Sequence, residues 1–381
     1  MKMKRALILV AFLFFLAYSL AIPAAAIESE LEVPEGFGDV LDKLPDDVAD
    51  KLPDEFYSGD ADVIGTALES IASPKYVLRV FGELLGDGIG ASLKLCATLC
   101  GILVVAALCS AIKCSVASDA LSGALRFAVA AAMFAVIIDV LSRQVEMVCG
   151  FFDRIGALVY SMIPVFGAIY VSGGSVSTAT ATSGSMYLFL AVSESFCAKT
   201  IVPIASICAA IALCRSLSPD IDLQSLGNAI KKCYTFALGF IMSILLLLLA
   251  SQSALASAAD SVGARAAKML TASMIPVVGG SVSETLRAAA AGVEYIKTVV
   301  GVGGVVFIIL LLLPTLVSLL LGRLALLIAS AIGGVLGCDD EVKLLGEIGN
   351  IYGCMIAAVS MCSVMFIFAM NIFIKTSVAM G

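Results

Sequence analysis

Charged side chains inside apolar sequence are the residues of this chain whose type and place could do chemistry. Six such residues occur: Asp139, Asp153, Arg154, Glu194, Lys199 and Arg323. Each costs about 2.5 to 3.5 kcal/mol at a bilayer centre, so each should face a bundle interior, an aqueous path or an interface. One interpretation is a route for ions or protons. The other, structural pairing or a place at a span end, is favoured because no single span carries paired acids.

The twelve cysteines begin only at Cys96 and lie in or beside apolar stretches. Cys96 and Cys100 are predicted to share a helix face, as are Cys354 and Cys362. The sequence contains no Cys-x-x-Cys pair, and it has no histidine to complete a usual zinc or haem site. We therefore expect small apolar residues at helix interfaces, with no metal and no cofactor.

Other catalytic and binding signatures are absent from the sequence. It contains no Walker-type phosphate loop, no nucleophile elbow and no recognisable catalytic dyad. The net charge of −7 comes without the basic stripe that nucleic-acid binding requires. An enzyme is not expected, and neither is a nucleic-acid partner.

The composition is that of an all-α, polytopic integral membrane protein. Apolar residues make up 61% of the chain and charged residues 14%, with a mean hydropathy of +1.07. Several runs reach the length of about 18 or more residues that crosses about 30 Å of hydrocarbon. The clearest are 95–112, 234–258, 299–321 and 351–374, and further candidates are 120–141, 156–171, 186–213 and 324–336.

The number and direction of the spans stay open at this stage. The stretch 186–213 contains Glu194, Lys199 and Pro203, so it could be one bent helix or two short ones. The stretch 324–336 is short for a crossing and could be re-entrant or interfacial. Counting Lys and Arg in the loops does not settle the orientation, because the side on which each loop lies depends on whether an odd or even number of spans precedes it. We expect six to eight spans.

The N-terminal region is predicted to be exported. Residues 1–26 combine a positive start, an apolar stretch and small residues near Ala26, which is typical of a cleaved signal peptide. Residues 27–92 form an acidic extracytoplasmic region with sixteen Asp or Glu against four Lys or Arg. Within it, 62–85 predicts an amphipathic helix or helix pair broken near Pro74. This segment could lie on the membrane, but its negative charge favours docking on a partner.

A repeated motif divides the membrane domain, 93–381. The sequence Ser-Met-Ile-Pro-Val, followed by Phe-Gly or Val-Gly, occurs at 161–167 and 273–279, and Gly-Gly-Ser-Val-Ser occurs at 173–177 and 279–283. Proline removes an amide donor, so such segments predict broken helices in two approximate repeats, 95–200 and 201–336, before a final span, 351–374. The candidate structural pivots are Pro164, Gly167, Gly173, Gly174, Pro276, Gly279 and Gly280.

Polar residues of both signs surround the second motif. One interpretation is a solvated connector with small residues that pack closely. The other is a half-buried gate or assembly surface, which the repetition of the motif favours slightly. The candidate assembly or gate residues are Gln252, Asp260, Arg265, Lys268 and Glu284.

These residues resemble the signature of the stage III sporulation protein AE family. The resemblance rests on Gln252, Asp260, 265–268, 275–279 and Ser283. The earlier Ile-Pro-Val and Gly-Gly segments, the signal, the acidic arm with Leu-Pro-Asp-Glu at 52–55 and the multi-span C-terminal half are similar as well. The resemblance covers most of the chain.

The resemblance implies a subunit of the channel or feeding apparatus that joins mother cell and forespore during endospore formation. Such a subunit lies in the mother-cell membrane around the forespore and acts as an export platform or conduit component. Its implied partners are other subunits of the complex, including an ATPase and intermembrane ring proteins, besides membrane lipid. The residues alone leave an alternative, a self-contained secondary transporter or permease for an unknown solute.

Overall fold

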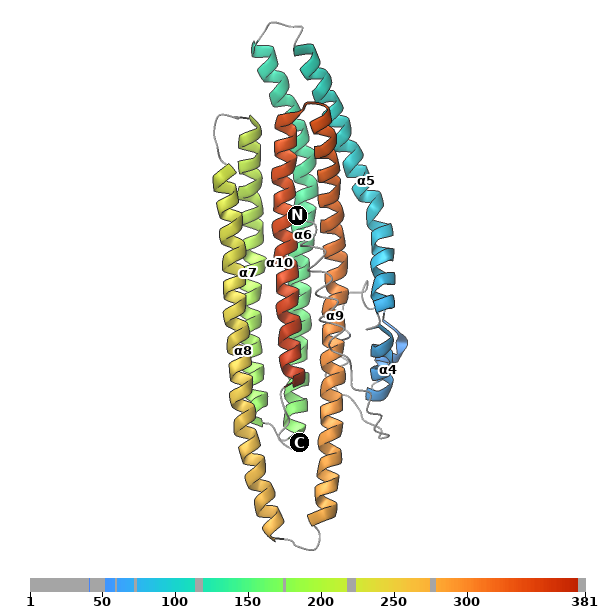
Figure 1. The fold of residues 1–381 in the computed structure, drawn as a ribbon, viewed down its shortest axis with the longest axis vertical. Coiled ribbons are helices and arrows are strands. Elements are labelled where there is room, and N and C mark those ends of the chain that lie inside the picture. The colour runs from blue at the N-terminus through green and yellow to red at the C-terminus, as the bar shows by residue number, and fades with distance from the viewer. Residues whose placement is uncertain are drawn as a thin grey trace.

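The computed structural model describes residues 41, 52–58, 60–71, 74–113, 119–173, 176–217, 224–274 and 279–375. The expected signal peptide, 1–26, lies outside these residues. The described elements are η1 (Asp54–Tyr57), α4 (Ala61–Ile71), α5 (Pro74–Lys113), α6 (Asp119–Ser172), α7 (Val176–Leu217), α8 (Gln224–Met274), α9 (Gly279–Val335) and α10 (Asp339–Lys375). The long helices α5 to α10 run antiparallel in chain order (Figure 1). The all-α prediction is confirmed.

Six helices are long and apolar enough to span a membrane in the described part of the chain. This number lies within the expected six to eight. Both 120–141 and 156–171 lie in α6, and both 299–321 and 324–336 lie in α9, so the prediction of separate spans there was wrong. The polar residues between those stretches lower the hydropathy without ending the helix. The stretch 186–213 is part of one helix, α7.

An even number of spans returns the chain to the side on which the first span began. In Figure 1, α4, the ends of α6, α8 and α10 and the starts of α7 and α9 lie toward the lower end of the bundle. The ends of α5 and α7, the starts of α6 and α8 and the α9–α10 turn lie toward the upper end. The first copy of the motif and the helix ends that flank the second copy therefore belong to the lower half, where the first span begins.

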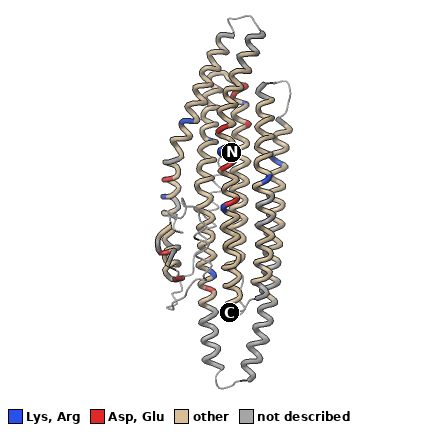
Figure 2. The backbone as a smooth tube through the Cα atoms, turned by 180° about the vertical axis from the view of Figure 1, so that it is seen from behind, with Lys and Arg blue, Asp and Glu red and all other residues tan. Residues whose placement is uncertain are grey.

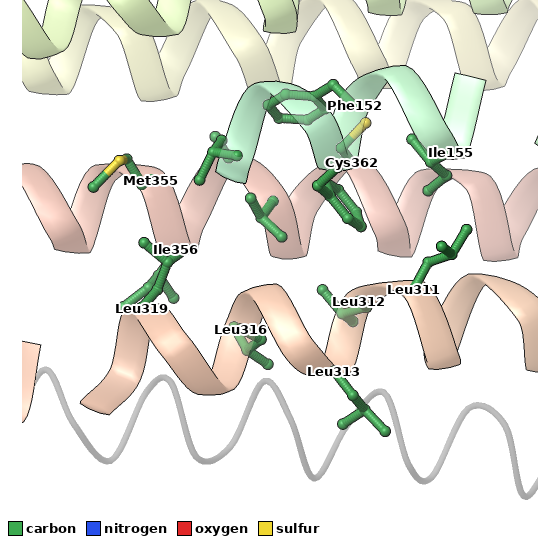
Figure 3. Packing of buried hydrophobic residues seen from close by; sticks show 14 of the residues in the cluster. Phe152, Ile155, Leu311, Leu312, Leu313, Leu316, Leu319, Met355, Ile356 and Cys362 are labelled. Carbon is green, nitrogen blue, oxygen red and sulfur yellow. The ribbon is translucent and has the colours of Figure 1, made fainter. Parts of the chain in front are cut away.

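Helices α9 and α10 form the core of the bundle. Figure 3 shows buried side chains of both helices packed together, with Leu319 pointing toward Ile356 and Phe152 of α6 on the other side of α10. The helices approach so closely because glycines face large side chains. A Cβ added at Gly301 would clash with Ile374, and one at Gly322 would lie 2.7 Å from the Tyr352 ring.

The turn between α9 and α10 depends on a left-handed glycine. Gly337 has a φ of +74°, a conformation that glycine adopts without a Cβ penalty. The amide of Gly337 donates to the Gly334 carbonyl at 3.4 Å, and the amide of Cys338 donates to the Gly333 carbonyl at 3.0 Å. This pair of bonds closes the helix end in a Schellman arrangement and starts α10 alongside α9.

The segment before α5 packs on the same chain. Helix α4 ends at Ile71 and α5 begins at Pro74, which confirms the predicted break, since proline suits the first turn of a helix. Phe56 is buried with its ring 5.9 Å from that of Phe307 in α9. Gly65 of α4 faces Tyr295 of α9. The apolar face of α4 thus covers α9, and docking of 62–85 on a partner stays a prediction.

The glycine contacts of α9 generate a stability test. Gly301→Ala places a methyl group against Ile374, and overpacking of this kind costs about 1 to 3 kcal/mol. Gly334→Ala is the matched control on the same helix, because an added Cβ there meets nothing within 4 Å. We expect detergent-solubilised Gly301→Ala to lose its monodisperse chromatographic peak at a lower temperature than Gly334→Ala. Equal melting of the two variants would contradict the close packing of α9 on α10.

Candidate functional site

Pro164 lies inside α6 and on its exposed side. The helix continues eight residues further, to Ser172, so the prediction that the first motif interrupts the helix at its proline was wrong. A proline removes one backbone hydrogen bond, and packing offsets this loss here. The flanking Met162, Val165 and Phe166 are all buried against neighbouring helices.

The first motif anchors the end of α10 instead. The rings of Phe166 and Phe373 are stacked, with centroids 4.6 Å apart and planes 13° apart. One turn later, the Tyr170 hydroxyl donates a 2.8 Å hydrogen bond to the Phe373 carbonyl oxygen. That carbonyl belongs to the last turn of α10, where no backbone amide of the helix reaches it. The sequence hinted at this contact only by placing two aromatic residues four apart in an apolar helix.

The chain turns at the first Gly-Gly-Ser-Val-Ser segment. After the first motif, the Gly173 amide donates to the Ile169 carbonyl at 3.1 Å, and α7 begins at Val176. Gly167 faces α7, where an added Cβ would lie 3.6 Å from the Ser183 hydroxyl oxygen. Gly174 lies outside the described residues.

The second motif lies at the connection between α8 and α9. Pro276 lies outside the described residues, whereas Gly279 and Gly280 form the start of α9. A helix begins at or within each Gly-Gly-Ser-Val-Ser segment, α7 at Val176 and α9 at Gly279, and both helix starts lie toward the lower end of the bundle (Figure 1). In the first copy the chain turns at the glycine segment and not at Pro164, whereas in the second copy the residues between Met274 and Gly279 lie outside the described part of the chain.

The candidate assembly residues occupy the two arms of the α8–α9 hairpin. Gln252, Asp260, Arg265 and Lys268 belong to α8, and Glu284 belongs to α9. Lys268 lies six residues before the end of α8 and Glu284 five residues after the start of α9, so the two positions are nearly level. Arg265, Lys268 and Glu284 belong to the helical turns next to the α8–α9 connection, whereas Gln252 lies near the middle of α8.

A buried ion pair joins α8 to α10. Lys231 Nζ lies 2.9 Å from Glu347 Oε2, and the two side chains are only 11% and 9% exposed. Such pairs are held by mutual attraction, and a single partner left alone would be a buried, uncompensated charge. The sequence singles out neither residue, because a contact across 116 residues leaves no mark in a single sequence.

The six charged residues within apolar sequence are spread over three helices, α6, α7 and α9. Asp139 pairs with Arg143 one turn away on α6, and Asp153 and Arg154 are exposed further along that helix. Glu194 and Lys199 belong to α7, and Lys199 is exposed. Arg323 lies on α9 against Gly353 of α10. Structural pairing accounts for Asp139, whereas the exposed charges of α6 need another explanation.

The expectation that the cysteines lie at helix interfaces holds only in part: Cys197, Cys208, Cys338, Cys354 and Cys362 are buried, whereas Cys214 and Cys233 are exposed. The Cys96 and Cys100 sulfurs are 4.0 Å apart on α5, which confirms their shared face, and Cys354 and Cys362 are buried in α10. In the described ranges, no three His, Cys, Asp or Glu residues come together in a way that could hold a metal ion.

The buried pair can be tested with one substitution at two sites. Lys231→Met leaves Glu347 buried without its partner, which costs about 3 to 5 kcal/mol. Lys343→Met breaks the more exposed Asp340–Lys343 pair and should cost about 0 to 1 kcal/mol. We expect a much larger drop in the melting temperature for Lys231→Met, partly recovered in Lys231→Met/Glu347→Leu. Similar melting of the two single variants would show that the buried pair stabilises nothing.

Comparison with known proteins agrees with the resemblance drawn from the motifs. The sequence model of the family described as stage III sporulation protein AE matches residues 67–377. The stage III sporulation protein AE of Bacillus subtilis (strain 168) is 22% identical over 218 residues. That match covers 57% of this chain and 55% of the relative, so it spans about half the length of each. No solved structure matches the chain. The match over most of its length shows that the chain belongs to the stage III sporulation protein AE family.

Proposed function

We propose that the chain is a membrane subunit of the channel or feeding apparatus that links mother cell and forespore. Membership of a sporulation family supports a role in spore formation and is the observation that carries the proposal. The six candidate spans fit a multi-pass membrane subunit. In this role the chain is an export platform or conduit component needed for forespore development.

In the proposed complex, energy comes from a partner ATPase and the chain itself is not an enzyme. The sequence supports this division because it contains no phosphate-binding loop. The ring proteins of the intermembrane space are the proposed partners of the acidic segment that precedes α4. The acidic region 27–92, to which this segment belongs, has sixteen acidic residues against four basic ones, which favours a protein partner over anionic lipid.

The proposed location is the mother-cell membrane around the forespore, with the N-terminal region outside the cytoplasm. Helix α5 then crosses inward, and the lower end of Figure 1 faces the intermembrane space. The starts of α7 and α9 and the end of α8 lie toward that end. The hairpin, with its residues of both signs, is the proposed assembly surface for neighbouring subunits.

Depletion of the protein in its native host tests this role. Forespore volume after engulfment should fall and sporulation efficiency should drop, while vegetative growth stays normal, because a channel subunit is needed only once the forespore is enclosed. Imaging of membrane-stained forespores gives the volume, and re-expression of the wild-type chain is the control. Normal spores together with a growth defect specific to one solute would refute the channel role and indicate a self-contained permease.

A further inference from the structure

One face of α6 carries a row of exposed charges through the middle of the bundle. Its members are Asp139, Arg143, Glu146, Asp153 and Arg154, all exposed. Asp139, Arg143 and Glu146 follow one another at spacings of four and three residues. Asp153 and Arg154 follow Glu146 by seven and eight residues, so all five lie on one side of the helix. The side chains of the first two are each 67% exposed. We refer to these five residues as the α6 charged face. Figure 2 shows charged residues along the middle of the bundle and not only at its ends.

Two contacts made by α9 show which part of α10 lies at the same height along the bundle as the α6 charged face. The Gln144 amide nitrogen on α6 donates a 3.0 Å hydrogen bond to the Ser318 hydroxyl on α9. Four residues further along α9, Gly322 faces Tyr352 of α10. Because α9 and α10 are antiparallel, Ser318 lies level with about Ile356. The charged face, centred near Gln144, is therefore level with the apolar stretch of α10 that begins at 351.

A contact between α8 and α10 shows which part of α8 lies at this same height along the bundle. Gly239 of α8 faces Met361 of α10, and both helices run in the same direction. The α8 residues level with the charged face are thus those around Phe236 and Phe240. The exposed side of α8 is apolar there and below: Phe236 is 75% exposed, Phe240 57% and Leu247 71%.

The α6 charged face and the exposed side of α8 lie at the same height along the bundle, but the first is charged and the second is apolar. An apolar face such as that of α8 suits lipid, whereas exposed carboxylates and guanidiniums in hydrocarbon are costly and normally face a bundle interior or a water-filled cavity. The interior of this single chain is filled by α9 and α10. The water that solvates the charged face must therefore lie outside the chain's own core.

We propose that the α6 charged face lines a water-filled path inside the assembled complex, and that the α8 face lies against lipid. This inference rests on the proposed function, since it gives a channel subunit its aqueous side. A tight contact between copies of α6 does not fit. Rotation about the membrane normal brings each residue to the depth of its copy, so Asp139 would meet Asp139 and Arg143 would meet Arg143. An open, hydrated path keeps these like charges apart.

Cysteine labelling in membranes from sporulating cells tests the assignment. Ser142→Cys places a thiol on the charged face, and Phe236→Cys places one on the apolar face of α8; both native residues are exposed in the chain. The probe is a positively charged, water-soluble methanethiosulfonate, added to opened vesicles and read by mass spectrometry of the labelled peptide. Because the reagent attacks the thiolate, and apolar surroundings disfavour ionisation, we expect Ser142→Cys to react more than about tenfold faster.

Slow labelling at both positions would overturn the proposal, because protein or lipid would then cover the charged face. Equally fast labelling at both would also overturn it, since the α8 face would then be in water. Ala157→Cys, exposed on the same side of α6, replaces Ser142→Cys if that variant fails to accumulate. If Ser142→Cys reacts slowly while depletion of the protein collapses the forespore, the water-filled path is refuted and the channel role stands. If Ser142→Cys reacts much faster than Phe236→Cys while depletion leaves spores normal, the channel role is refuted and the water-filled path stands.

Discussion

The close packing of α9 on α10 is the constraint on which the rest of the structure depends. Glycine at the contact points lets large side chains of α10 lie directly against the backbone of α9, and a left-handed glycine turns the chain so that the helices start side by side. In a membrane this packing replaces the hydrophobic driving force, because lipid is as apolar as the side chains. Helices α5, α6, α7 and α8 then pack around this pair, and α4 covers its lower part.

Helix length and membrane thickness do not match in this protein. With 54 residues, α6 is about 81 Å long at 1.5 Å per residue, and the 57 residues of α9 reach about 85 Å. A hydrocarbon layer of about 30 Å covers less than half of either. The apolar character of α9 therefore reports burial among other helices as much as contact with lipid. Depth is better judged from exposed side chains than from helix ends.

The sequence predicted much of this architecture and missed particular contacts for physical reasons. Composition identified a helical membrane bundle, and the proline rule located the break between α4 and α5 at Pro74. The same rule failed at Pro164, because tertiary packing holds α6 together where an isolated helix would bend. The Lys231–Glu347 pair and the Tyr170–Phe373 bond join residues more than 100 positions apart, so no local pattern announces them.

Charged residues occur in two different environments in the bundle. One is a buried ion pair that stabilises the fold, and the other is the exposed α6 charged face, to which we assign a role in function. Lys231 and Glu347 are buried together, so each removes the cost of the other, and neither is available to a solute. On α6 the charges stay exposed, and only Asp139 and Arg143 pair within the face. A structural role would favour burial and pairing throughout. Exposed charge at the depth of the apolar α8 side chains is stable only beside water, which one copy of this chain does not enclose.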